Sequence, residues 1–240
     1  ESTMDIIWEG IKKAVILIFT GNKEIYWILL RTIKVSIISL LFSILFGFPL
    51  GAVIGLNKFK GKGLVTVIIN TGMSFPPVAV GLILTLIIWR SGLLGFLGLM
   101  YSISAMIIAQ IIIIFPIIVG ITIAVVQQIN IGLIQQAKSL GANRIQLFWI
   151  LLKEVKFSVL MAISAGFGRS ISEIGAVLIV GGNIKGETRV LTTTIIQMTR
   201  IGKFDQAIAL AVILLFLSFG INLIIMIVQR RSMFLLIPKS

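Results

Sequence analysis

The sequence contains no cysteine and no histidine, and only 8 of its 240 residues are Asp or Glu. Without cysteine the chain can form no disulfide. Without thiolate or imidazole groups it also lacks the usual zinc ligands and the parts of Cys–His or Ser–His nucleophile systems. We therefore predict no catalytic residues, no metal site and no cofactor.

Charged residues make up only 12% of the chain, whereas 58% of its residues are hydrophobic. Three stretches carry no charge at all: 35–56 (22 residues), 64–89 (26 residues) and 207–228 (22 residues). A helix needs roughly 20 apolar residues to cross about 30 Å of hydrocarbon. In lipid a helix satisfies its own backbone hydrogen bonds, and these runs lack the alternation of barrel strands. The sequence predicts an all-α polytopic membrane protein.

The expected division of the chain follows these runs. Residues 1–25 form an N-terminal segment, in which 4–20 mixes charged and apolar residues and suits a helix at the membrane interface. Residues 26–231 form the transmembrane domain, and residues 232–240 form a cytoplasmic tail. About five transmembrane helices are expected, over residues 26–56, 64–89, 103–126, 157–180 and 206–229, with a polar loop at 127–156.

The net charge of +13 is distributed unevenly between the two ends of these helices. One side holds ten basic residues and a single acid, and the other holds ten basic residues and six acids. By the positive-inside rule the first side is cytoplasmic, which places the N-terminus outside and the C-terminus inside. Nucleic acid is not an expected partner, because no soluble domain carries a basic cluster. The charged residues on the side expected to be cytoplasmic are the bases Lys58, Lys60, Lys62, Lys138, Arg144, Lys153, Lys156, Arg230, Arg231 and Lys239 and the acid Glu154.

Small residues and prolines mark special positions within the expected helices. Gly47, Gly51 and Gly55 form two GxxxG steps on one helix face, which predicts close packing, either within one subunit or between subunits. Pro49, Pro76, Pro77 and Pro116 are expected to kink or break helices. Residues 74–77, Ser-Phe-Pro-Pro, are typical of an interrupted helix that lines a cavity.

The polar loop at 127–156 predicts a short helix, a turn centred on glycine and a second short helix, over residues 135–149. Apolar residues within it give the loop an apolar surface, which by composition alone suits an ordinary amphipathic connector. They are Ala137, Leu140, Leu147 and Phe148.

This stretch resembles the EAA loop of permease subunits of type I ABC importers, which have the MetI-like fold. Gln135, Gln136 and Ala137 occupy the Glu-Ala-Ala positions, and residues 140–142, Leu-Gly-Ala, match directly. Gln135 replaces the family's Glu, and residues 153–154, Lys-Glu, replace its Leu-Pro. The resemblance implies coupling helices that dock on a separate ATPase, with this role carried by Gln135, Ala137, Leu140, Gly141, Ala142 and Arg144.

A second informative segment contains Arg169 and Glu173, an ionisable pair at membrane depth, where charges are costly. Their spacing of four predicts one helix face, and both an intrahelical ion pair and a lining of a pathway or gate remain open. With its continuation through residue 193, the segment resembles the oxyanion branch of the family, most of all Tup-type tungstate permeases. Candidate path or gate residues are Ser74, Arg169, Ser170, Ser172, Glu173, Asn183 and Thr192.

The resemblance implies a permease subunit of a prokaryotic cell-membrane importer. It implies a homodimer in the lipid bilayer, two ABC ATPase subunits and an extracytoplasmic oxyanion-binding protein. Tungstate is the expected substrate, with molybdate or sulfate as alternatives. The stretch 55–63 is no P-loop, because five residues separate its glycines and no Ser or Thr follows its lysine. ATP hydrolysis is therefore expected on a partner chain.

Two other classes of protein stay open at this point. A secondary transporter would need no ATPase, but no convincing internal repeat is present. An intramembrane hydrolase would depend on Glu173, which has no second carboxylate near it in the sequence.

The predicted orientation can be tested by cysteine labelling, because the chain has no cysteine of its own. Lys138→Cys should react with a membrane-impermeant maleimide only after the cells are opened, since the loop is expected inside. Lys23→Cys, on the opposite side, should react in intact cells. Reaction of Lys138→Cys in intact cells would exclude an intracellular motor as its partner.

Overall fold

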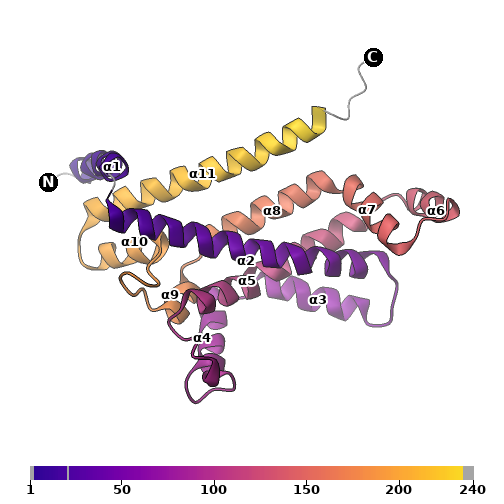
Figure 1. The fold of residues 1–240 in the computed structure, drawn as a ribbon, viewed down its shortest axis with the longest axis horizontal. Helices are drawn as coiled ribbons and strands as arrows, with labels where there is room; N and C mark the ends of the chain where they lie inside the picture. The colour runs from indigo at the N-terminus through magenta and orange to yellow at the C-terminus, as the bar shows by residue number, and fades with distance from the viewer. Residues whose placement is uncertain (1–2, 21, 235–240) are drawn as a thin grey trace.

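A computed structural model describes residues 3–20 and 22–234 of the chain, and this described part is built of helices without strands (Figure 1). The elements are α1 (Thr3–Phe19), α2 (Lys23–Leu56), α3 (Lys62–Met73), α4 (Pro77–Ile88), the 3-10 helix η1 (Gly95–Leu97), α5 (Ile103–Val126), α6 (Ile131–Ser139), α7 (Arg144–Glu154), α8 (Lys156–Ile171), α9 (Gly175–Gly181), α10 (Leu191–Arg200) and α11 (Phe204–Phe234).

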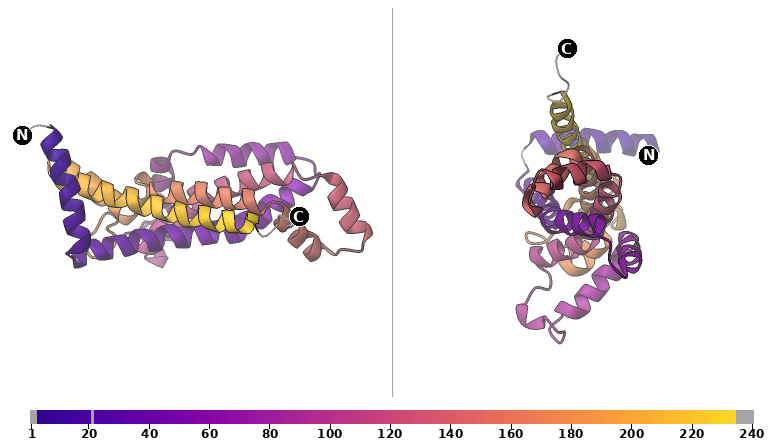
Figure 2. Two further views of the ribbon diagram at one scale, coloured as in Figure 1. Left: turned by 90° about the horizontal axis from the view of Figure 1, so that it is seen from above. Right: turned by 90° about the vertical axis from the view of Figure 1, so that its right-hand side faces the viewer.

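The long helices run lengthwise through an elongated bundle. Helix α2 packs on α5 and α8, while α11 contacts α1, α10 and α8. Helices α6 and α7 project from one end, together with the α2–α3 loop and the C-terminal end of α11 (Figures 1 and 2). Helices α1 and α10 lie at the opposite end, and α4 projects sideways. The segments assigned to one side of the membrane by charge thus lie at one end of the molecule.

The expected five spans appear as three single helices and two bent pairs. Helices α2, α5 and the 204–227 part of α11 are each long and apolar enough to cross a membrane. The span at 64–89, where residues 74–77 predicted an interruption, is broken, with α3 and α4 meeting at 100°. The span at 157–180, which was expected to be continuous, is also broken, with α8 and α9 meeting at 53°. Counting each pair as one span gives up to five crossings.

The boundaries of the expected segments shift slightly. Helix α2 begins at Lys23, before the expected start at residue 26, and α11 continues to Phe234, into the expected tail. Residues 1, 2, 21 and 235–240 lie outside the described part, and with them Lys239 and most of the predicted tail.

Proline breaks one helix and is accommodated in two others. Pro77 occupies the first turn of α4, and Pro76 before it has an extended backbone (φ −62°, ψ 121°), which ends α3 and turns the chain. By contrast, α2 continues through Pro49 and α5 through Pro116. The prediction of an interrupted helix at 74–77 is confirmed. Pro49 and Pro116 were expected to kink or break their helices, and neither helix is broken there.

The glycine stripe of α2 packs within the subunit. A Cβ atom added to Gly51 would lie 2.7 Å from Cβ of Thr122 and 2.8 Å from the carbonyl oxygen of Val119, both on α5. Gly47 and Gly55 face Ile118 and Val126 of the same helix, at 3.2 and 3.1 Å. The two helix backbones therefore approach closely along three turns, and the intrasubunit interpretation of the GxxxG steps is confirmed.

Helix α10 was not anticipated from the sequence. It begins at Leu191 with three threonines, a residue type that favours strands and turns over helices. Here Leu191 and all three threonines are buried, because the rest of the bundle packs on this face. Tertiary packing therefore overrides a weak local preference.

Gly51→Ala should destabilise the protein by about 1–3 kcal/mol, because the added methyl group overlaps backbone and side-chain atoms of α5. The thermal unfolding midpoint of the detergent-solubilised protein measures this. Gly220→Ala in α11 is the matched control, since nothing lies within 4 Å of its added Cβ. Equal midpoints for the two variants would contradict the packing described here.

Candidate functional site

The tip formed by α6 and α7 is shaped by a defined helix ending. The N–H of Gly141 donates to the carbonyl oxygen of Lys138, and the N–H of Ala142 donates to that of Ala137, both at 3.0 Å. This double pattern is the Schellman motif, which needs a left-handed residue at its centre. Gly141 supplies it with φ +81° and open space around its Cα. The Leu-Gly-Ala sequence is thus explained by the geometry of the turn.

The second helix of the tip starts immediately after this turn. The Oδ1 atom of Asn143 accepts from the N–H of Gln146 at 2.8 Å, and Oε1 of Gln146 accepts from the N–H of Asn143 at 2.9 Å. This reciprocal capping box fixes where α7 begins. The predicted helix, glycine-centred turn and second helix are confirmed.

The tip presents polar and apolar side chains to its surroundings. Gln135 and Gly141 are exposed, and Leu140 is 88% exposed, while Ala137 is buried and Ala142 is partly buried. Ile145 and Trp149 of α7 are also exposed, at 70% and 57%. Arg144 is the first residue of α7. An exposed apolar surface at the end of the bundle is a surface fit for a protein partner.

The second candidate region is the break between α8 and α9, where polar side chains form hydrogen bonds with backbone groups. Ser172 donates its hydroxyl to the carbonyl oxygen of Gly168 at 2.8 Å, and the carboxylate of Glu173 accepts from the N–H of Ala176 at 3.2 Å. The N–H of Ser172 still donates to the carbonyl oxygen of Gly168, at 3.3 Å, whereas the N–H of Ala176 is bonded by a side chain instead of a helical carbonyl, and α8 ends at Ile171. The prediction of a continuous helix through residue 173 is therefore wrong.

Arg169 and Glu173 pair across this break. Their Nη2 and Oε2 atoms are 3.7 Å apart, with 37% of the arginine side chain exposed and 3% of the glutamate. Because α8 ends between them, they do not share a helix face as expected. The ion pair is present, and it joins the last turn of α8 to the start of α9.

Ser170 and Thr192 are buried and hydrogen-bonded inside the subunit. Ser170 donates its hydroxyl to Oε1 of Gln110 at 2.6 Å, and Nε2 of Gln110 donates to the carbonyl oxygen of Ser170 at 3.1 Å. Thr192 on α10 donates to the carbonyl oxygen of Glu173 at 3.0 Å. The α8–α9 break is therefore tied to both α5 and α10.

Asn183 holds the loop between α9 and α10 in place. It has a positive φ of 52°, donates from Nδ2 to Oε1 of Gln197 at 2.9 Å, and accepts from the hydroxyl of Thr193 at 2.8 Å. Asparagine tolerates this left-handed conformation better than most residues. In this structure, the polar atoms of Asn183 are used to stabilise the loop.

The two helix breaks lie side by side. A Cβ atom added to Gly175, at the start of α9, would lie 2.8 Å from Cγ2 of Val78, and one added to Gly81 of α4 would lie 2.7 Å from Cα of Ala176. Ser74 and Ser172, one at each break, are exposed. The sequence-predicted residues thus divide into exposed groups at the breaks and buried groups that hold the second break together.

Gln110 belongs to the second candidate region but was not among the residues predicted from the sequence. It is 4% exposed and bonded twice to Ser170. The signal was present, because an amide within a 24-residue apolar helix is costly unless it has a partner. Nothing in the sequence indicated which residue that partner would be.

Comparison with curated proteins gives relatives along nearly the whole chain. The chain is 37% identical to the tungstate uptake system permease protein TupB of Peptoclostridium acidaminophilum, covering 95% of this chain and 100% of the relative. It is 35% identical to TupB of Campylobacter jejuni, covering 92% of each, and 38% identical to a probable anion ABC transporter permease protein of Haloferax volcanii, covering 80% and 84%.

Solved structures of low sequence identity share the fold. The MetNI methionine ABC transporter in an inward-facing conformation matches with a TM-score of 0.69 at 18% identity, covering 87% of this chain and 96% of that one. A bacterial alginate ABC transporter in complex with its periplasmic protein matches with a TM-score of 0.76 at 19% identity, covering 92% and 86%. These matches establish the MetI-like fold.

The family model for binding-protein-dependent transport system inner membrane components matches residues 47–233, which include the tip and both helix breaks. Together with the relatives above, this match shows that the chain belongs to that family of ABC transporter permeases.

Proposed function

We propose that this chain is the permease subunit of an ATP-driven importer for a tetrahedral oxyanion, with tungstate as the first candidate. A homodimer forms the path through the membrane, two separate ATPase subunits bind at the α6–α7 tips, and an extracytoplasmic binding protein delivers the anion. The similarity to two TupB proteins over more than nine-tenths of the chain carries the substrate assignment. Molybdate and sulfate permeases are more distant relatives and supply the alternatives.

Coupling to the ATPase is supported by the shape of the tip. Its Schellman turn and capping box fix α6 and α7 relative to each other, and its exposed apolar residues lie beyond the bundle (Figure 1). A rigid tip can transmit a movement of the ATPase to the bundle, whereas a flexible loop would not. The basic residues at the same end favour a cytoplasmic location for it.

Control of the path is assigned to the two adjacent helix breaks. The exposed Ser74 and Ser172 and the partly exposed Arg169 offer hydroxyl and guanidinium donors to an oxyanion in a wide, transient cavity. The same break is held from inside the subunit by the buried side chains of Ser170, Glu173 and Thr192. A break held by side-chain bonds rather than a continuous helix can change its angle as the two bundles move.

Gly141→Asp should reduce tungstate uptake to below about a tenth, because it adds a side chain and a negative charge to the turn that faces the ATPase. Uptake by proteoliposomes with the ATPase and binding protein measures this. Gly61→Asp is the matched control: Gly61 has φ +90°, open space around it and a place at the same end of the bundle. Equal loss of uptake in both variants would contradict a specific role for the tip.

Glu173→Gln should leave assembly with the ATPase intact but lower uptake about tenfold. The amide oxygen can still accept from the N–H of Ala176, whereas the charge pair with Arg169 is lost. Co-purification and uptake measure the two effects. Glu187→Gln makes the same change at an exposed residue and should transport normally. Parental uptake by Glu173→Gln would show that the pair is dispensable.

Competition between anions distinguishes the candidate substrates. In the same proteoliposomes, unlabelled tungstate should abolish uptake of labelled tungstate, whereas a hundredfold excess of sulfate should leave most of it. If sulfate competes as well as tungstate, the sulfate alternative is correct. Calorimetry of the binding protein with each anion provides the control, because that protein is expected to make the selection.

A further inference from the structure

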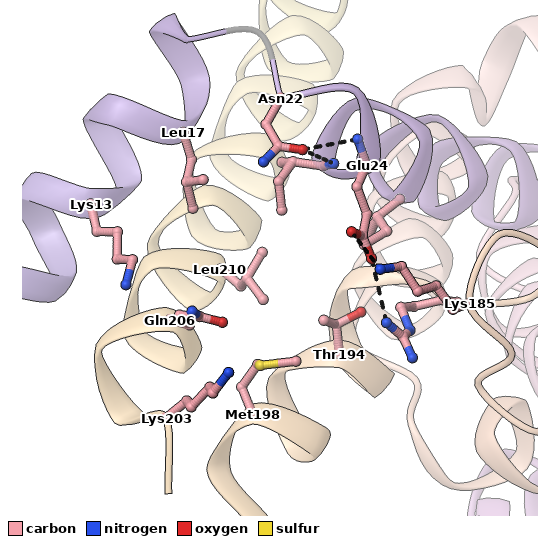
Figure 3. Close-up of a pocket in the computed structure, with 13 residues that line it drawn as sticks. Lys13, Leu17, Asn22, Glu24, Lys185, Thr194, Met198, Lys203, Gln206 and Leu210 are labelled. Atoms are coloured by element: carbon pink, nitrogen blue, oxygen red, sulfur yellow. Dashed lines mark hydrogen bonds and ion pairs between the residues drawn. The ribbon is translucent and has the colours of Figure 1, made fainter. Parts of the chain in front are cut away.

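A polar cavity lies at the end of the bundle opposite the tip, among α1, α2, α10, α11 and the loop before α10 (Figure 3). It is open to its surroundings and has a volume of about 350 Å³. Its lining is Lys13, Leu17, Asn22, Glu24, Ile25, Ile28, Lys185, Arg189, Thr194, Met198, Lys203, Gln206 and Leu210. No residue of it was singled out as a candidate in the sequence.

The lining carries four bases and one acid. Glu24 pairs with both Lys185 and Arg189, at 3.1 and 3.5 Å, and Lys13 pairs with Asp205 beside the cavity. Within the described residues, Lys203 has no ion pair, and its ammonium group extends toward the cavity from the α10–α11 corner (Figure 3). After all these pairs are counted, the cavity retains an excess of positive charge.

Arg189 shows most directly that the positive charge around the cavity is not fully paired. Only 12% of its side chain is exposed, and within the described part its buried Nε has no hydrogen-bond partner. A buried donor of this kind normally has a partner, since an unmade bond costs free energy. Its remaining contact with Glu24 is long for an ion pair, at 3.5 Å. An anion in the cavity would balance the charge of Arg189 more fully than the distant carboxylate of Glu24 does alone.

The other wall of the cavity is apolar. It consists of Leu17 from α1, Ile25 and Ile28 from α2, Met198 from α10 and Leu210 from α11. A small inorganic anion gains nothing from such a wall, because dehydrating it costs free energy that apolar side chains do not return. A molecule with a phosphate group and a hydrocarbon chain uses both halves of the lining.

We propose that this cavity binds an anionic phospholipid, with its phosphate among Lys203, Lys185 and Arg189 and an acyl chain along the apolar wall. The site does not depend on the transported anion, and it lies on the side assigned above to the outer leaflet. Basic pockets between membrane helices are a known means of holding lipid headgroups.

The arrangement of α1 gives the bound lipid a structural role. Helix α1 crosses α11 at Gly10, where an added Cβ would lie 2.5 Å from Cγ2 of Ile208, and it presents Trp8, Ile11 and Val15 outward. An exposed apolar face of this kind suits the membrane interface. Beyond its contact with α11, α1 borders the cavity, so that a lipid there would bridge α1 to α2 and α10.

Native mass spectrometry of the full-length chain, purified in detergent, tests the proposal. We expect dioleoylphosphatidylglycerol to bind at one molecule per chain, in preference to dioleoylphosphatidylcholine. Lys203→Gln should weaken its binding about fivefold, because one cationic contact is lost. Gln206→Glu, a change without added volume that brings a negative charge into the lining, should also weaken it. Inorganic phosphate and tungstate should neither bind nor displace the lipid.

Lys12→Gln is the matched control. Lys12 precedes Lys13 on α1 but lies over the ring of Trp8, 5.4 Å from its centre, and does not line the cavity. It should bind phosphatidylglycerol like the parent. Equal binding of the two lipids, or equal effects of Lys203→Gln and Lys12→Gln, would overturn the proposal. Binding of phosphate or tungstate that is sensitive to Lys203→Gln would instead identify an inorganic anion site, and would overturn the lipid assignment without touching the proposed transport function.

Discussion

The requirement that every backbone polar group find a partner in a medium without water governs this structure. It accounts for the helices, and it also explains how they can stop. At the α8–α9 break, the carboxylate of Glu173 accepts from the N–H of Ala176, and the hydroxyl of Ser172 adds a bond to the carbonyl oxygen of Gly168. Gln110 and Thr192 complete the arrangement from neighbouring helices. A break inside the bundle is possible only because side chains supply the missing partners.

Glycines, which have no side chain, allow several pairs of helices in this bundle to pack closely. Between helices surrounded by lipid the hydrophobic effect contributes little, so contact area and short-range attraction hold the bundle together. The glycines of α2 bring it onto α5 over three turns, and Gly81 and Gly175 do the same where α4 meets α9. The contact of α4 with α9 joins the first helix break to the second.

The two ends of the bundle are built for different partners. At one end, α6 and α7 form the exposed tip, whose surface apolar side chains are suited to binding a protein. At the other, α1 and the α9–α10 loop surround a cavity with a cationic side and an apolar side, suited to a lipid. The region that matches the family model begins at residue 47, so it contains the tip but neither α1 nor the start of α2.

The sequence by itself determined the features that depend on local composition and spacing. Charge-free runs indicated the membrane helices, and α5 has the bounds that were expected from them. Residues 140–146 encode their turn and cap directly, because the Schellman glycine and the Asn–Gln capping box are both local. The interruption at Pro76 and Pro77 was likewise predictable, since two successive prolines remove two donors and disfavour helical backbone in the residue before each. Only the tertiary structure decided the break after Ile171, the bonding of Ser170 to Gln110 across 60 residues, and the burial of the α10 threonines. The break has local bonds of its own, but Gln110 and Thr192 hold it from elsewhere in the chain, and the other two features depend on distant partners throughout. A polar side chain does not reveal from its sequence neighbours which distant group will satisfy it.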